Sequence, residues 1–214
     1  MKTIGVFDSG VGGLSVADAI VKAFPDDMIE YREDTKNVPY GTKTPEQIYG
    51  FVKPILDELA STCDVIVIAC NTVTTLFIEK LRKEITVPLI GIEPMIKPAA
   101  QLTGSKKITV CATPATLASN RYAYLKKQYA NNVAIFEPDC SDWASLIEKD
   151  EVTVKKIKED IEPSIEQGSD VIVLGCTHYH WIEKEIKEIV GTKAVVLQPE
   201  LAVISRLKVV LGQG

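Results

Sequence analysis

The chain has 214 residues, of which 46% are hydrophobic and 25% are charged, and its formal net charge at pH 7 is −5. These proportions are typical of an ordinary globular protein with one large domain or two domains of roughly 100 residues each. The acidic balance, without a basic cluster, argues against nucleic acid or an anionic membrane as a partner, and no apolar run approaches the roughly 18 residues that span a bilayer.

The first predicted strand covers residues 3–7 and runs into a glycine-rich loop, Asp8-Ser-Gly-Val-Gly-Gly-Leu-Ser15. Its glycines permit a tight turn and expose backbone amides, which suits the binding of an anion. The loop lacks the Lys-Ser/Thr ending of a P-loop and is not a clean dinucleotide fingerprint. Asp8 stands at the tip of the strand, where it either faces a ligand or caps the helix predicted for residues 13–24.

A second loop, Asp34-Thr-Lys-Asn-Val-Pro-Tyr-Gly41, is rich in turn-forming residues. It is suited to closing over a ligand through backbone amides, although an ordinary surface turn has the same composition. Arg32 and Glu33 precede it. They either form a surface ion pair or place the Arg32 guanidinium against a carboxylate of the ligand. A helix is predicted for residues 44–60.

The most informative pattern is a repeated segment that ends in a cysteine. One β-branched apolar run stops at Cys70 and continues into Asn71-Thr72. Half a chain later, a similar run stops at Cys176 and continues into Thr177-His178. In a parallel sheet each cysteine lies at the carboxyl end of its strand, where α/β proteins bind ligands, and a helix start there favours anions. A lone cysteine in such a place is usually inert and buried. Two equivalent ones predict a pair of thiols that face one substrate.

The repeat extends to the strands around these cysteines. The run at residues 4–7 recurs in outline at 108–111, and a third strand closes each half at 87–92 and 194–197. We therefore predict an α/β fold of two pseudo-symmetric halves, each a mainly parallel sheet of three recognised strands flanked by helices, with the active site between them. The alternative is that βα units converge on similar sequences. The remaining predicted helices cover residues 73–85, 116–130, 141–147, 152–167 and 180–190.

The domain boundaries follow from the same pattern. The first α/β domain is expected to cover residues 1–97, with a C-terminal helix at 204–214 that packs back on it. The second is expected to cover residues 98–203. Proline and glycine are scattered at the ends of elements, without a linker-like stretch.

The only two histidines of the chain, His178 and His180, both follow Cys176 closely. A histidine at this spacing can serve a cysteine as an acid/base partner or stabilise its thiolate. Cys176, His178 and His180 are also three potential zinc ligands, but no second Cys/His cluster supplies a fourth, so no metal is expected. His180 opens the predicted helix, where it is either functional or simply exposed.

The other three cysteines, at positions 63, 111 and 140, lack such neighbours and are expected to be structural. Five cysteines in a chain large enough to build its own core do not resemble a disulfide framework. The amino terminus runs directly into a strand pattern without the layout of a signal peptide. A reducing cytoplasm is therefore the expected location.

Taken in order, five blocks of the sequence resemble the signature of the bacterial glutamate racemases: Asp8–Ser15, Pro39–Gly41, Ala69–Thr72, Thr113–Thr116 and Gly175–Tyr179. The resemblance covers nearly the whole chain. It implies an isomerase of two α/β domains that needs no metal or organic cofactor and makes D-glutamate for peptidoglycan. It also implies catalytic roles for Cys70 and Cys176, assisted by Asp8, His178 and Glu148. Substrate contacts are implied for Ser9, Tyr40, Gly41, Asn71, Thr72, Thr113, Thr116 and Thr177.

Some positions depart from this family pattern. The pairs Arg32-Glu33 and Cys140-Ser141, and also His180, stand where the family usually has other residues, and the tail after Pro199 is short. The aspartate-specific relatives differ more, because they lack the Asp-Ser-Gly-Val-Gly-Gly opening and carry an acid where His178 stands. Glutamate is therefore the expected small-molecule partner, and a homodimer is the expected assembly. A racemase for another acidic amino acid and a catalytically weak binding protein remain as alternatives.

Racemisation explains why two thiols are needed. The reaction removes the Cα proton from one face and returns a proton to the other, so two acid/base groups must flank the carbon. The sequence shows no cofactor motif and no lysine placed for a pyridoxal Schiff base, so side chains alone must do this work. Thiols are suitable because their ordinary pKa, near 8.5, can be tuned towards neutrality.

Overall fold

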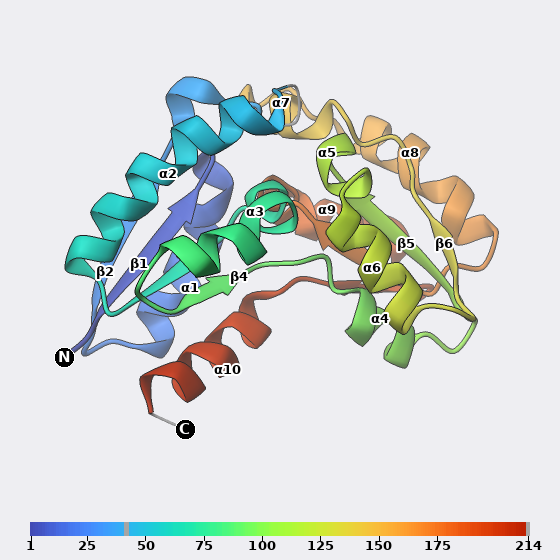
Figure 1. The fold of residues 1–214 in the computed structure, drawn as a ribbon. Coiled ribbons are helices and arrows are strands. Elements are labelled where there is room, and N and C mark those ends of the chain that lie inside the picture. Colours follow the sequence, from blue (N-terminus) through green and yellow to red (C-terminus); the bar gives the residue numbers. More distant parts are fainter. Residues whose placement is uncertain (41–42, 213–214) are drawn as a thin grey trace. The chain divides into compact units, whose positions relative to one another are not determined.

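Two parallel sheets organise the chain in the computed structural model, which describes residues 1–40 and 43–212. The chain divides into a first unit, Met1–Glu93 with Pro199–Gly214, and a second unit, Pro94–Gln198 (Figure 1). The described residues form one four-stranded sheet in each unit, in the orders β2-β1-β3-β4 and β6-β5-β7-β8. All the strand pairs of both sheets are parallel. The predicted α/β class, with two halves built on parallel sheets flanked by helices, is confirmed.

The first unit alternates strands and helices, as a parallel sheet requires. Its strands are β1 (Thr3–Asp8), β2 (Met28–Glu33), β3 (Val65–Ile68) and β4 (Leu89–Gly91). Its α-helices are α1 (Leu14–Ala23), α2 (Pro45–Thr62), α3 (Asn71–Glu84) and α10 (Glu200–Leu211). Two short 3₁₀ helices, η1 (Val11–Gly13) and η2 (Thr35–Asn37), follow β1 and β2.

Local sequence explains where α2 begins, and apolar spacing explains which side of it is buried. Thr44 caps the helix by accepting from the Gln47 amide while the Gln47 side chain accepts from the Thr44 amide, and Pro45 occupies the first position. The buried positions are Ile48, Val52, Leu56 and Leu59, which recur at helical spacing. They pack with α3 against one face of the first sheet. The opposite face is covered by α1 and α10.

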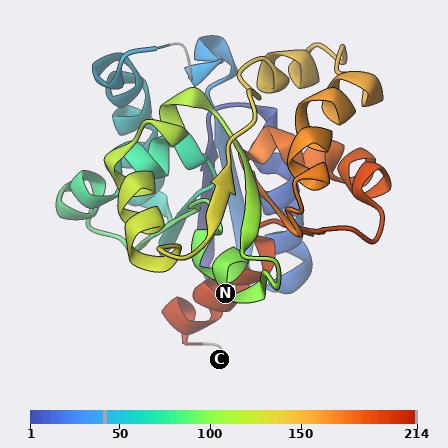
Figure 2. The same cartoon turned by 90° about the vertical axis from the view of Figure 1, so that its right-hand side faces the viewer.

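The second unit repeats this plan. Its strands are β5 (Lys107–Ala112), β6 (Ala134–Phe136), β7 (Val171–Gly175) and β8 (Val195–Leu197). Its α-helices are α4 (Ile96–Leu102), α5 (Pro114–Leu117), α6 (Asn120–Tyr129), α7 (Trp143–Glu148), α8 (Val154–Glu166) and α9 (Glu183–Val190). A 3₁₀ helix, η4 (Thr177–Ile182), joins β7 to α9. Figure 2 shows β5 in green beside β6 in yellow.

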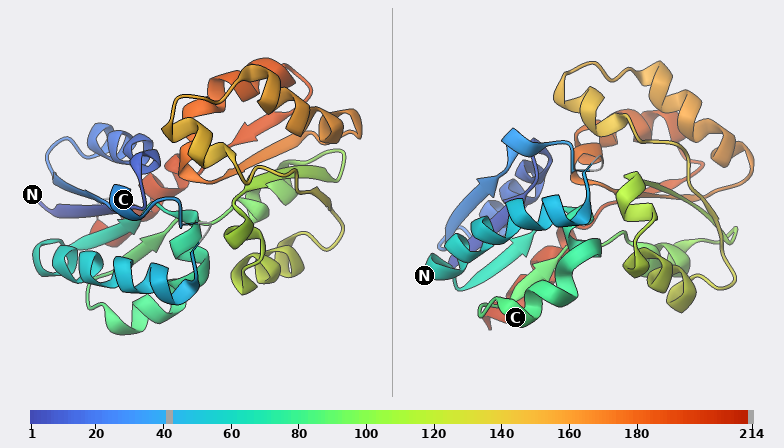
Figure 3. Two further views of the ribbon diagram at one scale, coloured as in Figure 1. Left: turned by 90° about the horizontal axis from the view of Figure 1, so that it is seen from above. Right: turned by 45° about the horizontal axis from the view of Figure 1, so that its top comes forward.

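Helices cover both faces of the second sheet (Figure 3). The buried residues of α8 and α9 pack against one face, and those of α4 and α6 pack against the other. The central strands β5 and β7 are therefore apolar on both sides and read as continuous hydrophobic runs, as is usual for parallel sheets. This is why the sequence shows them so clearly.

The sheets each contain one strand more than the three that were predicted. The additional strands are β2 and β6, which lie at the edges of their sheets. β2 has the sequence Met-Ile-Glu-Tyr-Arg-Glu, in which charged residues alternate with apolar ones, and β6 has only three residues. Both are partly exposed, so neither carries the apolar run by which the central strands were recognised.

Some predicted helix boundaries were also wrong. The single helix predicted at 116–130 is split at Ser119, whose hydroxyl caps a new helix, α6, by accepting from the Tyr122 amide. The helix predicted from His180 begins only at Glu183, because η4 occupies residues 177–182. The last helix starts at Glu200, earlier than predicted, and α4 was not predicted. No helix in the described ranges has the length and apolar character needed to cross a membrane.

Candidate active site

Cys70 stands between β3 and α3, at the carboxyl edge of the first sheet. Its extended backbone forms the N-cap of α3, and its side chain is 5% exposed. The thiol donates to Ser9 Oγ at 3.4 Å. The first amides of the 14-residue α3 and the helix dipole favour negative charge at this position. Two residues predicted for the site, Ser9 and Cys70, are thus in contact within the first unit.

Asp8 ends β1, the strand that lies beside β3 in the same sheet. Its side chain is completely buried, and its Oδ2 accepts from the Gly13 amide at 2.9 Å and the Gly10 amide at 3.3 Å. Gly13 must be a glycine, because a Cβ there would lie 2.4 Å from the Cβ of Asp8. The glycine-rich loop thus uses its amides to hold this protein carboxylate. Asp8 therefore holds the backbone just before α1, although the N-cap residue of α1 is Gly13. That Asp8 faces a ligand stays a prediction.

Tyr40 is fixed by the loop that follows β2. Its hydroxyl donates to Asp34 Oδ2 at 2.7 Å, and Asn37 Nδ2 donates to both Asp34 oxygens at 2.8 and 3.0 Å. Burial raises the pKa of the Tyr40 phenol, and the bond to Asp34 raises it further, so this hydroxyl remains a donor. The sequence did not predict that Asp34 would accept hydrogen bonds from both Tyr40 and Asn37. Gly41, the other predicted substrate ligand of this loop, lies outside the described residues.

Asn71 and Thr72 form the first turn of α3 and are both buried. In the part of the chain that the structure describes, neither the Oδ1 nor the Nδ2 atom of Asn71 has a hydrogen-bond partner. A buried, unsatisfied amide costs about 1–3 kcal/mol. Such a group is typical of a ligand-binding site, where the ligand supplies the missing partner.

Cys176 occupies the equivalent place in the second unit, after β7 and before η4. Its side chain is 7% exposed, and its Sγ lies 3.8 Å from His178 Nδ1. The other ring nitrogen, Nε2, lies 2.7 Å from Glu148 Oε1. The three predicted residues Cys176, His178 and Glu148 therefore form a continuous thiol–imidazole–carboxylate chain within one unit. The carboxylate orients the ring, and the ring is positioned to exchange a proton with the thiol.

Packing holds α7, which carries Glu148, against η4, which carries His178. The rings of Trp143 and Tyr179 meet edge to face, with centroids 5.1 Å apart. Tyr179 Oη donates to the Cys140 carbonyl at 2.8 Å, and Trp143 Nε1 donates to Asp160 at 2.7 Å. Burial raises the pKa of the Tyr179 phenol, so it keeps the proton that this bond requires.

The predicted threonines of the second unit also lie at the carboxyl edge of its sheet. Thr113 follows β5, and its hydroxyl accepts from the Thr116 amide at 3.3 Å and donates to Thr116 Oγ1 at 3.0 Å. The register pairs Ala112 of β5 with Gly175 of β7, which places Thr113 and Cys176 after neighbouring strand ends. A side chain at Gly175 would meet the Ala112 Cβ at 2.9 Å, so glycine allows this close approach. Thr177 is buried in the first turn of η4.

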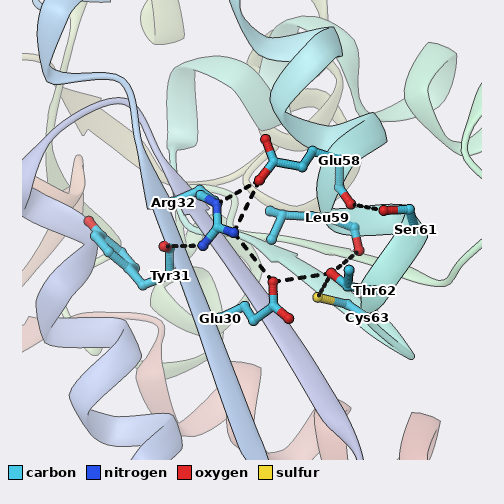
Figure 4. A network of polar contacts seen from close by, with 8 residues as sticks. All are labelled: Glu30, Tyr31, Arg32, Glu58, Leu59, Ser61, Thr62 and Cys63. Atoms are coloured by element: carbon cyan, nitrogen blue, oxygen red, sulfur yellow. Dashed lines mark hydrogen bonds and ion pairs between the residues drawn. The ribbon is translucent and has the colours of Figure 1, made fainter.

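Arg32 lies on the α2 side of β2 and is engaged by protein carboxylates (Figure 4). Its Nε and Nη2 atoms each donate to Glu58 Oε1 at 3.1 Å, and Nη2 lies 3.6 Å from Glu30 Oε2. Arg32 thus forms surface ion pairs with Glu58 and Glu30, and the alternative of a pair with Glu33 was wrong. Side chains alternate along a strand, so Glu33 is placed on the opposite face from Arg32, together with Tyr31.

The other cysteines are buried thiols, and none of the five cysteines forms a disulfide bond. The neighbouring Cys111 thiol and burial raise the pKa of Cys140, so that group stays protonated. His180 is also buried rather than exposed. Within residues 1–40 and 43–212, no three histidine, cysteine, aspartate or glutamate side chains are grouped as ligands for a metal.

Comparison with known proteins identifies the family. The family model for Asp/Glu/Hydantoin racemase matches residues 4–205. A glutamate racemase of Clostridium botulinum is 38% identical over 212 residues, which cover 97% of this chain and 82% of that protein. A glutamate racemase of Ralstonia nicotianae is 35% identical over 209 residues, covering 95% and 76% of the two chains.

Solved structures agree with this assignment. The Escherichia coli glutamate racemase, crystallised with L-glutamate and the activator UDP-MurNAc-Ala, matches with a TM-score of 0.91 and 30% identity, over 99% of this chain and 82% of that one. The Aquifex pyrophilus glutamate racemase matches with a TM-score of 0.75 and 35% identity, over 96% and 82%. The chain belongs to the Asp/Glu/Hydantoin racemase family of isomerases, in its glutamate racemase group.

Proposed function

We propose that this protein interconverts L- and D-glutamate without a cofactor, using Cys70 and Cys176 as two acid/base groups. One observation carries the proposal: each unit presents a buried thiol at the carboxyl edge of its sheet. Cys176 lies 3.8 Å from the His178 ring, and Cys70 follows the strand next to the one that ends in Asp8. The substrate is inferred from the glutamate racemases to which the chain is similar. In this proposal each thiol exchanges a proton with one face of the substrate's Cα.

The proton balance of the reaction is simple. One cysteine, as a thiolate, takes the Cα proton and becomes a thiol, while the electron pair of the C–H bond remains on the carbon. The other cysteine, as a thiol, gives its proton to the opposite face and becomes a thiolate. No net proton is consumed, and the reverse reaction uses the same groups in exchanged roles.

The neighbours of the two thiols differ, which gives each cysteine its own proton partner. Asp8 ends the strand next to the one that leads to Cys70, and we assign it to that thiol. His178 lies 3.8 Å from the Cys176 sulfur and is oriented by Glu148. With an acid assigned to one thiol and an imidazole beside the other, the two thiols have different proton-transfer partners.

The substrate contacts proposed for this site are short polar side chains and backbone amides: Ser9, Tyr40, Gly41, Asn71, Thr72, Thr113, Thr116 and Thr177. Asn71 gives the strongest support, because its buried amide has no partner among the described residues and could bind both a carboxylate and an ammonium group. Donors of this kind would also stabilise the negative charge that develops as the Cα proton leaves.

The biological setting is proposed from the resemblance to the glutamate racemases. We infer that the D-glutamate supplies peptidoglycan synthesis, that the protein acts in the reducing cytoplasm and that it assembles as a homodimer. The mechanism requires two reduced thiols, and neither Cys70 nor Cys176 forms a disulfide bond in the structure.

Exchange at Cα tests the proposal directly. In D₂O, the wild-type protein should convert either enantiomer of glutamate into the racemic mixture, with deuterium entering at Cα, and should act far less on aspartate. Cys70→Ala and Cys176→Ala should each abolish racemisation but leave the fold intact. Cys63→Ala, which removes another buried thiol of the first unit, is the control and should retain turnover.

Three results would count against the proposal. Near-native turnover in Cys176→Ala would remove the second base. Faster conversion of aspartate than of glutamate would assign the site to a different acidic substrate. Binding of glutamate without any Cα exchange would make the protein a binding protein.

A further inference from the structure

Tyr31 lies beside the loop that holds Asp8, although it belongs to the edge strand β2. The register of β1 and β2 pairs Val6 with Tyr31, so the tyrosine stands two positions before the level of Asp8. Its hydroxyl donates to the Gly10 carbonyl at 2.9 Å. A long side chain of the neighbouring strand thus reaches the backbone of the glycine-rich loop.

This contact bears on the position of the Asp8 carboxylate. Asp8 Oδ2 accepts from the amides of Gly10 and Gly13, both of which belong to the same loop. An ideal Cβ on Gly13 would lie 3.2 Å from the Tyr31 hydroxyl as well as 2.4 Å from the Asp8 Cβ. The phenol, the loop and the carboxylate are therefore packed together around one glycine.

A glycine-rich loop does not hold its own shape well. Glycine has more backbone freedom than any other residue, so its amides keep a fixed direction only when other contacts restrain them. The Tyr31 hydrogen bond supplies one such restraint, and its loss would leave a polar carbonyl in a partly buried place without this donor.

The phenol is kept in the form that can donate. Burial raises the pKa of Tyr31, and the negative charges of Asp8 and Glu33 raise it further. A hydrogen bond with the Glu33 carboxylate, beside the one to Gly10, and the nearby Cys70 also raise it. The hydroxyl therefore keeps its proton across the pH range in which proteins work. A protonated phenol beside two carboxylates is suited to positioning and not to proton transfer.

We propose that Tyr31 is a positioning residue that acts through Asp8, by fixing the Gly10 carbonyl so that the loop amides hold the Asp8 carboxylate in place beside Cys70. Its effect on turnover rests on the proposed function, in which Asp8 serves the Cys70 thiol. The physical link between Tyr31 and the loop does not rest on it.

The test compares Tyr31→Phe with Tyr122→Phe. Tyr122 is a matched control, because it is buried and its hydroxyl donates to Glu137 at 2.8 Å, away from the residues assigned to catalysis. In Tyr31→Phe, the Gly13 amide should exchange with solvent about tenfold faster, because its bond to Asp8 opens more often. In Tyr122→Phe the exchange of this amide should be unchanged.

Kinetics show whether the link matters for catalysis. Tyr31→Phe should lower kcat for glutamate about tenfold and leave KM unchanged, because Asp8 acts on the thiol and not on substrate binding. Adding Tyr31→Phe to Asp8→Asn should cause no further loss, since the tyrosine acts through the aspartate. A structural role alone would give additive losses and a matching loss in Tyr122→Phe.

The outcomes separate the two proposals. If the wild-type protein does not racemise glutamate, the proposed function fails, and the exchange of the Gly13 amide still decides the link between Tyr31 and the loop. An unchanged Gly13 exchange rate in Tyr31→Phe would overturn the positioning role whatever the activity. A kcat equal to that of the control, or additive losses with Asp8→Asn, would also overturn it.

Discussion

Replacing Glu148 by Gln tests whether the carboxylate on α7 supports the second thiol. The bond between Glu148 Oε1 and His178 Nε2 is 2.7 Å long, and the side chains are 25% and 6% exposed, so it is short and largely shielded from water. A hydrogen bond to a charged group contributes about 1.5–3 kcal/mol, and a neutral one about 1 kcal/mol. Glutamine can keep the neutral bond, so the expected loss is about 0.5–2 kcal/mol. If the full difference acts in the transition state, kcat falls roughly 2- to 30-fold.

The assay is the initial rate of racemisation followed by polarimetry, starting from each enantiomer. Glu151→Gln is the control, because Glu151 is an exposed acid just after α7 and the change also removes one negative charge. The rate should fall in Glu148→Gln alone, with both proteins folded by circular dichroism. An unchanged kcat in Glu148→Gln, or an equal fall in the control, would refute the argument that Glu148 works through His178.

Three further predictions concern other parts of the chain. Gly13→Ala should destroy activity, because the new Cβ would lie 2.4 Å from the Cβ of Asp8. Gly50 has open space around it, so Gly50→Ala should raise the free energy of unfolding by about 0.5–1 kcal/mol. Arg32→Ala should leave KM for glutamate unchanged in steady-state assays, because its guanidinium binds surface carboxylates. Burial alone would raise the pKa of Asp170, but hydrogen bonds from residues 103–105 outweigh it, and the net pKa is lowered. Its stabilising contribution is therefore present above the ordinary Asp pKa of about 3.9 and is lost as the pH falls through the lower, folded-state value. Asp170→Asn should destabilise the fold by about 1 kcal/mol near neutral pH, after allowance for solvent screening, and by less at about pH 3, as measured by urea unfolding.

The sequence was sufficient for the fold class and the central strands. β3 and β7 are buried on both faces, so their apolar runs stand out, and each leads into a cysteine at the sheet edge. The edge strands were missed for the opposite reason. In β2, Tyr31 contacts the Asp8 loop while Arg32 binds Glu58 on the other face of the strand. The resulting mixture of apolar and charged residues resembles the sequence of a surface segment.

The contacts between candidate residues were predictable only in part. The short spacing of Cys176 and His178 indicated an interaction, and the structure places their side chains 3.8 Å apart. Glu148 was reached only through the family resemblance, because no spacing rule brings a residue thirty positions earlier to an imidazole. Asp34 was seen as a turn former, and its role as acceptor for Tyr40 depends on a loop conformation that composition does not specify.

The order in which the elements are synthesised does not match the order in which the two units can be completed. The second unit is one continuous stretch, while the first needs α10, which is translated only after the whole of the second unit. Val203 and Leu207 of α10 pack with Val16 and Ile20 of α1, over one face of the first sheet. Until those residues emerge, α1 covers that apolar face without α10, even though most of its unit was translated first. The nascent amino-terminal half should therefore need chaperone protection for longer than the half that follows it.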